Sequence, residues 1–164
     1  MRAAIIDSSS LINLVHLELA GELALHFNIV YVPRAVQTEV NRKHRFRHRL
    51  NKLYRTGVFV KCAAADKTDV ELLRAELDAG EAEALIQGRE KSAVAFIGDE
   101  KRAREIGSNL GLKPVGTVRI LARLHLENRA EETKLLVRKL RRDLNFRVSD
   151  DIVRLGIEQA HEPI

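Results

Sequence analysis

The chain has little of several residue types, and each shortage excludes a class of protein. Cys62 is the only cysteine among 164 residues, which excludes an internal disulfide framework and favours a reducing compartment. There is no Trp, and only 4% of the residues are aromatic. No apolar run approaches the roughly 20 residues of a membrane-spanning helix. The first acid, Asp7, comes too early for a secretory signal. We therefore expect a cytoplasmic protein with no membrane partner.

The signatures of several enzyme classes are also missing. The chain contains no Walker A sequence and no Gly-x-Gly-x-x-Gly run, which argues against a nucleotide-phosphate cradle. The serines at 8–10 have no His at a recognisable spacing, so a nucleophilic serine is not favoured. His44 and His48 have the i, i+4 spacing of half a zinc site. With Cys62 as the only cysteine, solvated or RNA-facing histidines are the favoured interpretation.

Two further enzyme classes place acids at strand ends, and both fit poorly. A phosphatase of the haloacid-dehalogenase type needs a second Asp two residues after the first, where this chain has Ser9. A response-regulator receiver needs paired acids early in the chain and a lysine beyond the phosphoacceptor, and neither feature can be placed. Both classes rank below the alternatives that follow.

Apolar runs alternate with helical patterns along the whole chain. Its 164 residues and 45% apolar content fit one domain, 1–164, with a sizeable core. Strands alternating with helices predict an α/β fold, in which helices cover both faces of a parallel sheet. The runs that predict strands are residues 3–6, 28–32, 57–62, 93–97 and 113–115. The helical patterns predict, among others, a helix from Pro33 into the basic segment, a helix over about 67–77 and a terminal helix with Ser149 as its N-cap.

Carboxylates stand at the ends of two of these predicted strands. Asp7 follows the run at 3–6, and Asp99 follows the run at 93–97 after one glycine. In open α/β sheets, ligands bind outside the carboxyl ends of the strands. Mg²⁺ and Mn²⁺ prefer hard oxygen ligands, and a phosphodiester site needs several of them. The two acids together therefore indicate a metal-dependent active site.

Two more acids, Glu39 and Glu81, recur on the early turns of predicted helices, and each acid has a structural alternative. Asp7 and Asp99 are good N-caps for the helices that follow them. Glu81 lies in a first turn, where the helix dipole favours negative charge. Glu39 can pair with Lys43 one turn later. Singly the acids leave both interpretations open, whereas jointly the acids at the two strand ends favour function.

The net charge of +5 is concentrated in one segment. Residues 42–55 contain seven Lys or Arg and no acid, so without them the chain would carry −2. Such a run attracts polyanions, which suggests nucleic acid. Phe46 and Tyr54 can stack on bases or belong to the apolar stripe of this helix. A second basic surface, within residues 134–142, is better explained as a solvated helix face.

Four motifs, taken in order, resemble those of a PIN-domain protein of the toxin-like bacterial and archaeal branch. Residues 5–12 resemble the family's apolar-Asp-Thr/Ser-Ser-x-Leu-Ile start, and residues 33–40 resemble its Pro-x-x-Val-x-x-Glu-Val segment. Residues 77–84 resemble Leu-x-x-Gly-Glu-x-x-Ala, and residues 99–104 resemble Asp-Asp-x-x-x-Arg. Gly116-Thr117 and the ending at 146–149 also fit, so the resemblance covers nearly the whole chain.

The resemblance implies a PIN-like three-layer α/β/α fold with a central parallel sheet. It also implies an endoribonuclease that depends on Mg²⁺ or Mn²⁺, and the role of toxin in a toxin–antitoxin pair. RNA, an antitoxin protein and a second copy in a homodimer are the implied partners. An inactive PIN-like module that binds RNA or an antitoxin is the alternative.

The resemblance and the charge pattern together assign roles to individual residues. The catalytic acids are Asp7, Glu39, Glu81 and Asp99. The metal ligands are Asp7, Glu81, Asp99 and Glu100. The substrate-binding residues are Ser9, Arg104, Thr117, Arg45, Arg47 and Arg49. A salt bridge from Arg104 to Glu100 is an equal alternative for that arginine.

The chain departs from the family pattern at three places. Glu100 replaces the second Asp of the Asp-Asp pair, and Arg119 stands where a Gly commonly follows Gly-Thr. The segment after Glu39 is also unusually basic. These departures are expected either to tune the choice of substrate or to mark a member without catalysis.

Overall fold

The computed structural model describes residues 1–63 and 66–164. Its internal contacts divide the chain into two compact units, Met1–Pro114 and Val115–Ile164. The first unit contains the acids of interest and all of the sheet except Val115, the last residue of its edge strand. The second unit is helical. Each unit is described by itself.

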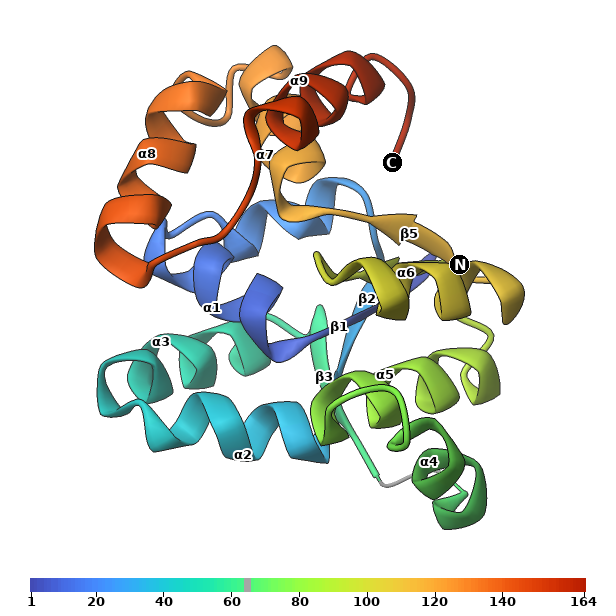
Figure 1. Cartoon of the computed structure of the whole chain (residues 1–164). Helices are drawn as coiled ribbons and strands as arrows, with labels where there is room; N and C mark the ends of the chain where they lie inside the picture. Colours follow the sequence, from blue (N-terminus) through green and yellow to red (C-terminus); the bar gives the residue numbers. More distant parts are fainter. Residues whose placement is uncertain (64–65) are drawn as a thin grey trace. The chain divides into compact units, whose positions relative to one another are not determined.

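A five-stranded sheet has the order β3-β2-β1-β4-β5 (Figure 1). Its strands are β1 Ala3–Ile6, β2 Ile29–Pro33, β3 Phe59–Cys62, β4 Ala95–Ile97 and β5 Lys113–Val115. β1 is central and pairs in parallel with β2 and β4, while β2 pairs in parallel with β3. The predicted parallel sheet is therefore confirmed, with all five strands close to their predicted positions. Helices flank it, as expected of a three-layer α/β/α fold.

The described residues of the first unit form one 3₁₀ helix and six α-helices. They are α1 Ser8–His16, η1 Ala20–Leu25, α2 Arg34–Arg42, α3 His44–Arg55, α4 Lys67–Leu73, α5 Ala79–Glu90 and α6 Lys101–Asn109. Helix α4 is shorter than the helix expected over 67–77, because its C-cap is Arg74 and hydrogen-bonded turns follow.

The helix expected to run from Pro33 into the basic segment is in fact two helices. Lys43 adopts φ −94° and ψ 89°, which ends α2 and begins α3. A continuous helix would place Phe46 about 240° around the axis from Val40, away from the core, at about 100° per residue. The break at Lys43 allows Val40 and Phe46 both to be buried, with 0% and 1% exposure.

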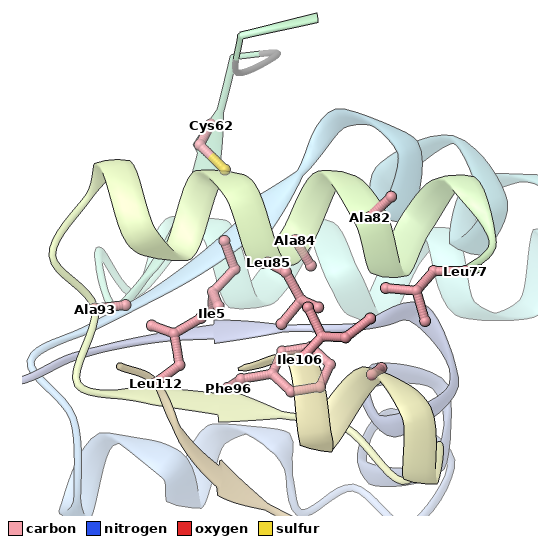
Figure 2. Packing of buried hydrophobic residues seen from close by; sticks show 11 residues of the cluster. Ile5, Cys62, Leu77, Ala82, Ala84, Leu85, Ala93, Phe96, Ile106 and Leu112 are labelled. Atoms are coloured by element: carbon pink, nitrogen blue, oxygen red, sulfur yellow. The ribbon is translucent and has the colours of Figure 1, made fainter. Parts of the chain in front are cut away.

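One face of the sheet packs against α5 and α6 (Figure 2). Ile5 on β1 is in register with Phe96 on β4, and both contact the cluster that contains Leu85 and Ile106. Helix α5 lies close to the sheet because it has Gly88, where an added Cβ would be only 2.7 Å from the Ile5 side chain. Close packing at Gly88 therefore holds the C-terminal half of α5 against β1.

The second unit consists mainly of α7 Thr117–Leu126, α8 Thr133–Leu144 and α9 Asp150–Gln159. Helix α7 contacts both α8 and α9. Ser149 is the N-cap of α9, as predicted, and accepts a hydrogen bond from the backbone N–H of Ile152 at 3.2 Å. Among the described helices of the chain, none has the length and apolar character needed to cross a membrane.

Candidate active site

Asp7 joins β1 to α1 and is held by both. Its backbone N–H donates to the carbonyl of Ile97 at 3.0 Å, which continues the pairing of β1 with β4. Its Oδ1 accepts the backbone N–H of Ser10 at 2.8 Å, so Asp7 is the N-cap of α1. The residue is only 3% exposed. Asp7 therefore both caps a helix and stands at the end of a strand.

Asp99 lies beside Asp7 because Gly98 has no side chain. A Cβ on Gly98 would be 2.4 Å from the Phe96 ring and 2.8 Å from Oδ2 of Asp7. The Ser10 hydroxyl donates to Oδ2 of Asp99 at 3.4 Å, and it also forms a hydrogen bond that lowers the pKa of Asp7. Ser10 therefore links the carboxylates that follow the neighbouring strands β1 and β4.

Glu81 takes part in a capping box at the start of α5. Its backbone N–H donates to Oδ1 of Asp78 at 2.8 Å, and its Oε2 accepts the backbone N–H of Asp78 at 3.2 Å. Glu81 therefore has the structural role in a first helical turn that the sequence offered as an alternative. The carboxylate still lies close enough to Asp7 to raise the pKa of that residue.

Glu39 of α2 is bonded to Ser8 of α1, and its charge contributes to raising the pKa of Glu81. The Ser8 hydroxyl donates to Oε2 of Glu39 at 2.5 Å. The same hydroxyl is 3.6 Å from the position that a Cβ on Gly80 would take. Ser8 therefore connects α2 to the first turn of α5. The pair of Glu39 with Lys43 is not formed, because Lys43 is the residue where α2 ends.

The pKa values of two carboxyls show that these acids form one cluster. Burial first, and then the charges of Asp99 and Glu81, together raise the pKa of Asp7 to about 8. Burial first, and then the charges of Asp78, Glu100 and Glu39, together raise the pKa of Glu81 to about 7. The acids from four separate segments therefore repel one another at one edge of the sheet, which favours binding of a cation there.

Glu100 and Glu83 have structural roles at helix starts. Glu100, and not Asp99 as predicted, is the N-cap of α6, and it accepts the backbone N–H of Ala103 at 2.7 Å. Glu83 accepts the backbone N–H groups of Arg34 and Ala35 at 3.1 and 3.2 Å. Glu83 thus satisfies the N-terminus of α2, the helix that carries Glu39, and it fixes that helix against α5.

The serines that contact the acids are Ser8 and Ser10, which the sequence analysis did not assign to the site. Both are buried, whereas Ser9 lies on the exposed side of α1. A signal for Ser8 was available, since it precedes the buried Leu11 and Ile12 by three and four residues. Residues at those spacings share one face of a helix.

The arginines expected to bind substrate differ in their contacts. Within the described residues, the Arg104 guanidinium forms no ion pair, so its alternative bridge to Glu100 is absent. Arg49 donates to the carbonyls of Val15 and His16 at 3.2 and 3.4 Å and pairs with Glu18 at 3.3 Å. Arg49 thereby satisfies the C-terminal end of α1, a structural role.

Arg45 and Arg47 are exposed residues of α3. The guanidinium of Arg45 lies 4.6 Å from the centre of the Phe46 ring. Phe46 itself is buried, which favours its structural interpretation over stacking on a base. Tyr54 is half-buried, with the ammonium of Lys61 4.7 Å from the centre of its ring. The basic surface therefore consists mainly of cations without aromatic faces open to solvent.

Two predicted features belong to the second unit. Thr117 is the first residue of α7, after the N-cap Gly116, and its exposure is 0%. Arg119 is 7% exposed and donates to the carbonyl of Pro163 at 3.1 Å. Arg119, which stands where the family commonly has a glycine, thus connects α7 to the C-terminal residues of its own unit.

The donor set of the cluster suits Mg²⁺ or Mn²⁺ by its chemistry, because every donor is a carboxylate oxygen. Asp7 is buried beside other acids, and the charged groups that shift its pKa are acids. In residues 1–63 and 66–164, however, no three His, Cys, Asp or Glu side chains are arranged as a metal-binding group. Capping bonds and Ser8 hold several carboxylates in their present positions.

A parallel sheet with acids collected at the carboxyl ends of its strands makes the chain an α/β domain whose ligands are expected at that edge. The family model described as DUF3368, a PIN domain, matches residues 3–162. The chain therefore belongs to the PIN-domain family, whose members are generally nucleases. No curated protein and no solved structure matches the chain.

Proposed function

We propose that this protein is a metal-dependent endoribonuclease that hydrolyses phosphodiester bonds of RNA with Mg²⁺ or Mn²⁺. The observation that carries the proposal is the buried Asp7 carboxyl, with its pKa raised to about 8 among neighbouring acids. A structure that buries like charges together is destabilised by their repulsion unless a cation joins them. The carboxylates that would take the ion are those of Asp7, Glu81, Asp99 and Glu100.

Each part of the cluster has a separate task in this proposal. A bound ion supplies a water that ionises near neutral pH and offsets charge on the leaving oxygen. Asp7 and Asp99, fixed by Ser10, orient the site from the two central strands. Glu39, fixed by Ser8, faces the cluster from α2. Glu81, held by its capping box with Asp78, adds a carboxylate from the start of α5.

RNA is the proposed substrate because of the exposed cations of α3. Arg45 and Arg47 are free to contact phosphates, which would position RNA without reading its sequence. Arg104 and Ser9 remain proposed substrate contacts on α6 and α1. Thr117 is fully buried in the second unit, so the substrate contact expected of it is not retained. Pairing with an antitoxin and homodimer formation rest on the family alone, and they are proposed on that basis.

The decisive experiment measures cleavage of labelled single-stranded RNA and tRNA by chelator-treated protein, with and without Mn²⁺ or Mg²⁺. Asp99→Asn is expected to reduce cleavage at least about a thousandfold, since it removes a charged ligand at the reacting centre. Asp69→Asn is the matched control, because Asp69 pairs with Arg89 at the surface between α4 and α5. Full activity of Asp99→Asn, or cleavage without any divalent ion, would refute the proposal.

A second candidate function has its own supporting observation. The carboxylates of Glu81 and Glu100 accept backbone N–H groups at helix starts, and Glu39 is bonded to Ser8. Acids engaged in this way suit an inactive PIN-like module that binds RNA or a protein partner. Mn²⁺ titration monitored by calorimetry separates the two. Saturable binding that Asp99→Asn abolishes favours the nuclease, and RNA binding without any Mn²⁺ binding favours the module.

A further inference from the structure

The second unit has a groove between α8 and α9 that the proposed nuclease does not use. Its volume is about 490 Å³, within the roughly 300–1,000 Å³ of specific binding clefts. Val137 and Val153 are buried and form its floor together with the half-buried Ile157. All the lining residues belong to the second unit, so the groove is complete within Val115–Ile164.

Cations surround this apolar floor. Lys134, Arg138 and Arg141 reach it from α8, and Arg154 reaches it from α9. Arg141 pairs with Asp150 at 2.9 Å, and Arg154 pairs with Asp151 at 2.6 Å. In the part of the chain that the structure describes, Lys134 and Arg138 have no such acidic partner.

Lys134 and Arg138 are the important pair of the groove. Both are exposed, and among the described residues neither side chain pairs with an acid. They are four residues apart on α8, which places them on one face about 6 Å apart along the helix axis. The groove thus presents two unpaired positive charges, one helical turn apart, beside aliphatic side chains.

We propose that this groove binds an acidic amphipathic segment of a partner protein. The segment would carry two carboxylates about one helical turn apart, with aliphatic side chains between them. The carboxylates pair with Lys134 and Arg138, and the aliphatic groups cover Val137, Val153 and Ile157. The complementarity of charge and apolar surface carries this assignment, which is independent of the nuclease activity.

RNA suits the groove less well than such a segment. Asp150 and Glu158 line it from near the two ends of α9, about 12 Å apart at 1.5 Å per residue. A continuous polyanion lying along α9 would meet both acids, whereas a peptide can place its acids only between them. The apolar floor also offers no partner to phosphates, because it has neither charge nor hydrogen-bond donors.

The test is selection from a displayed peptide library against the full chain, followed by affinity measurements on the enriched peptides. We expect enrichment of peptides with two acids three or four residues apart around Leu, Ile or Val. Lys134→Glu with Arg138→Glu should weaken their binding at least about tenfold, as reversal of two charges at an interface implies. Ile157→Thr should weaken it severalfold, because it removes apolar contact from the floor.

The matched control is Arg142→Glu with Arg147→Glu, which makes the same change of charge outside the groove. Both residues are exposed and neither lines the groove. This variant should bind the peptides as the unchanged chain does. Failure to enrich acidic amphipathic peptides, or equal binding by the groove and control variants, would overturn the proposal. Loss of RNA affinity in the groove variant, without any peptide of this pattern, would make the groove an RNA surface instead.

Discussion

The acid cluster and the basic helix α3 both concentrate charge of one sign, but they differ in burial. Asp7 is 3% exposed among other acids, and the pKa of its carboxyl is raised to about 8. Arg45 and Arg47 on α3 are exposed to solvent. Water screens exposed charges, so their mutual repulsion costs little, whereas buried like charges destabilise the fold.

This difference bears on how function is inferred from charge. An exposed basic helix is also common on solvated surfaces that have no binding function. On α3, the contacts of Arg49 give it a structural role, which distinguishes it from Arg45 and Arg47. A cluster of acids around a buried carboxyl such as Asp7 has no comparable structural benefit beyond helix capping. The cluster therefore supports a metal-dependent function more strongly than the basic segment supports RNA binding.

The largest expected effect comes from Gly98→Ala at the acid cluster. The added Cβ would be 2.4 Å from the Phe96 ring and 2.8 Å from Oδ2 of Asp7. We expect the free energy of unfolding to fall by about 3 kcal/mol, as in overpacked cores. Chemical denaturation measures it. Gly21→Ala is the control, because its Cβ would meet only Leu53, at 4.0 Å. Equal stability of the two variants would show that the strand end of β4 adapts easily.

Asp7→Asn should stabilise the metal-free protein. The pKa of Asp7 is about 8 in the folded protein and near 3.8 when unfolded. Between these values the folded state binds more protons, so the wild-type free energy of unfolding falls as pH rises. The variant lacks this contribution, and its advantage should grow from near zero at acid pH to about 2 kcal/mol above pH 8.

Denaturation across this pH range, with and without Mn²⁺, checks that prediction. Saturating Mn²⁺ should stabilise the wild type and leave Asp7→Asn nearly unchanged. Cluster acids other than Asp7 remain in the variant, so the comparison isolates this residue. A constant difference between the two proteins at every pH would mean that Asp7 titrates as an exposed acid.

A smaller effect is expected from Ser8→Ala. It removes the hydroxyl that donates to Oε2 of Glu39 at 2.5 Å. A hydrogen bond to a charged group contributes about 1.5 kcal/mol, which is the expected loss of stability. Ser9→Ala, one residue further along α1 at an exposed position, should change the free energy of unfolding little. If the two substitutions are equivalent, Ser8 does not hold Glu39 in solution.

The sequence predicted the sheet well because its strands are short apolar runs between helical patterns. The carboxyl ends of β1 and β4 could be predicted because an acid, Asp7 or Asp99, follows each apolar run. The division of α2 from α3 was missed, although the phase of the apolar residues contained the signal. Val36 and Val40 define one stripe, and Phe46 and Leu50 define another that a continuous helix cannot align with it.

Side-chain contacts within the site were harder to predict than its position. Ser8 has a helical-spacing signal, but the bond of its hydroxyl to Glu39 depends on how α2 packs beside α1 and α5. Asp78 and Glu81 form a capping box, yet Glu81 also adds to the repulsion at Asp7. Such dual roles depend on long-range packing, which local patterns do not contain.

The smallest effects are expected on α3, where Arg47 and Arg49 form a matched pair. Arg47→Ala should weaken RNA binding by a few-fold and reduce the slope of log affinity against log salt concentration by about one. Arg49→Ala should lower the free energy of unfolding by about 0.5 kcal/mol, since it loses an exposed ion pair with Glu18 and bonds to two carbonyls of α1. RNA titrations at several salt concentrations and denaturation of both variants measure this. If Arg49→Ala changes the salt slope as much as Arg47→Ala does, its contacts with α1 do not exclude it from the RNA surface.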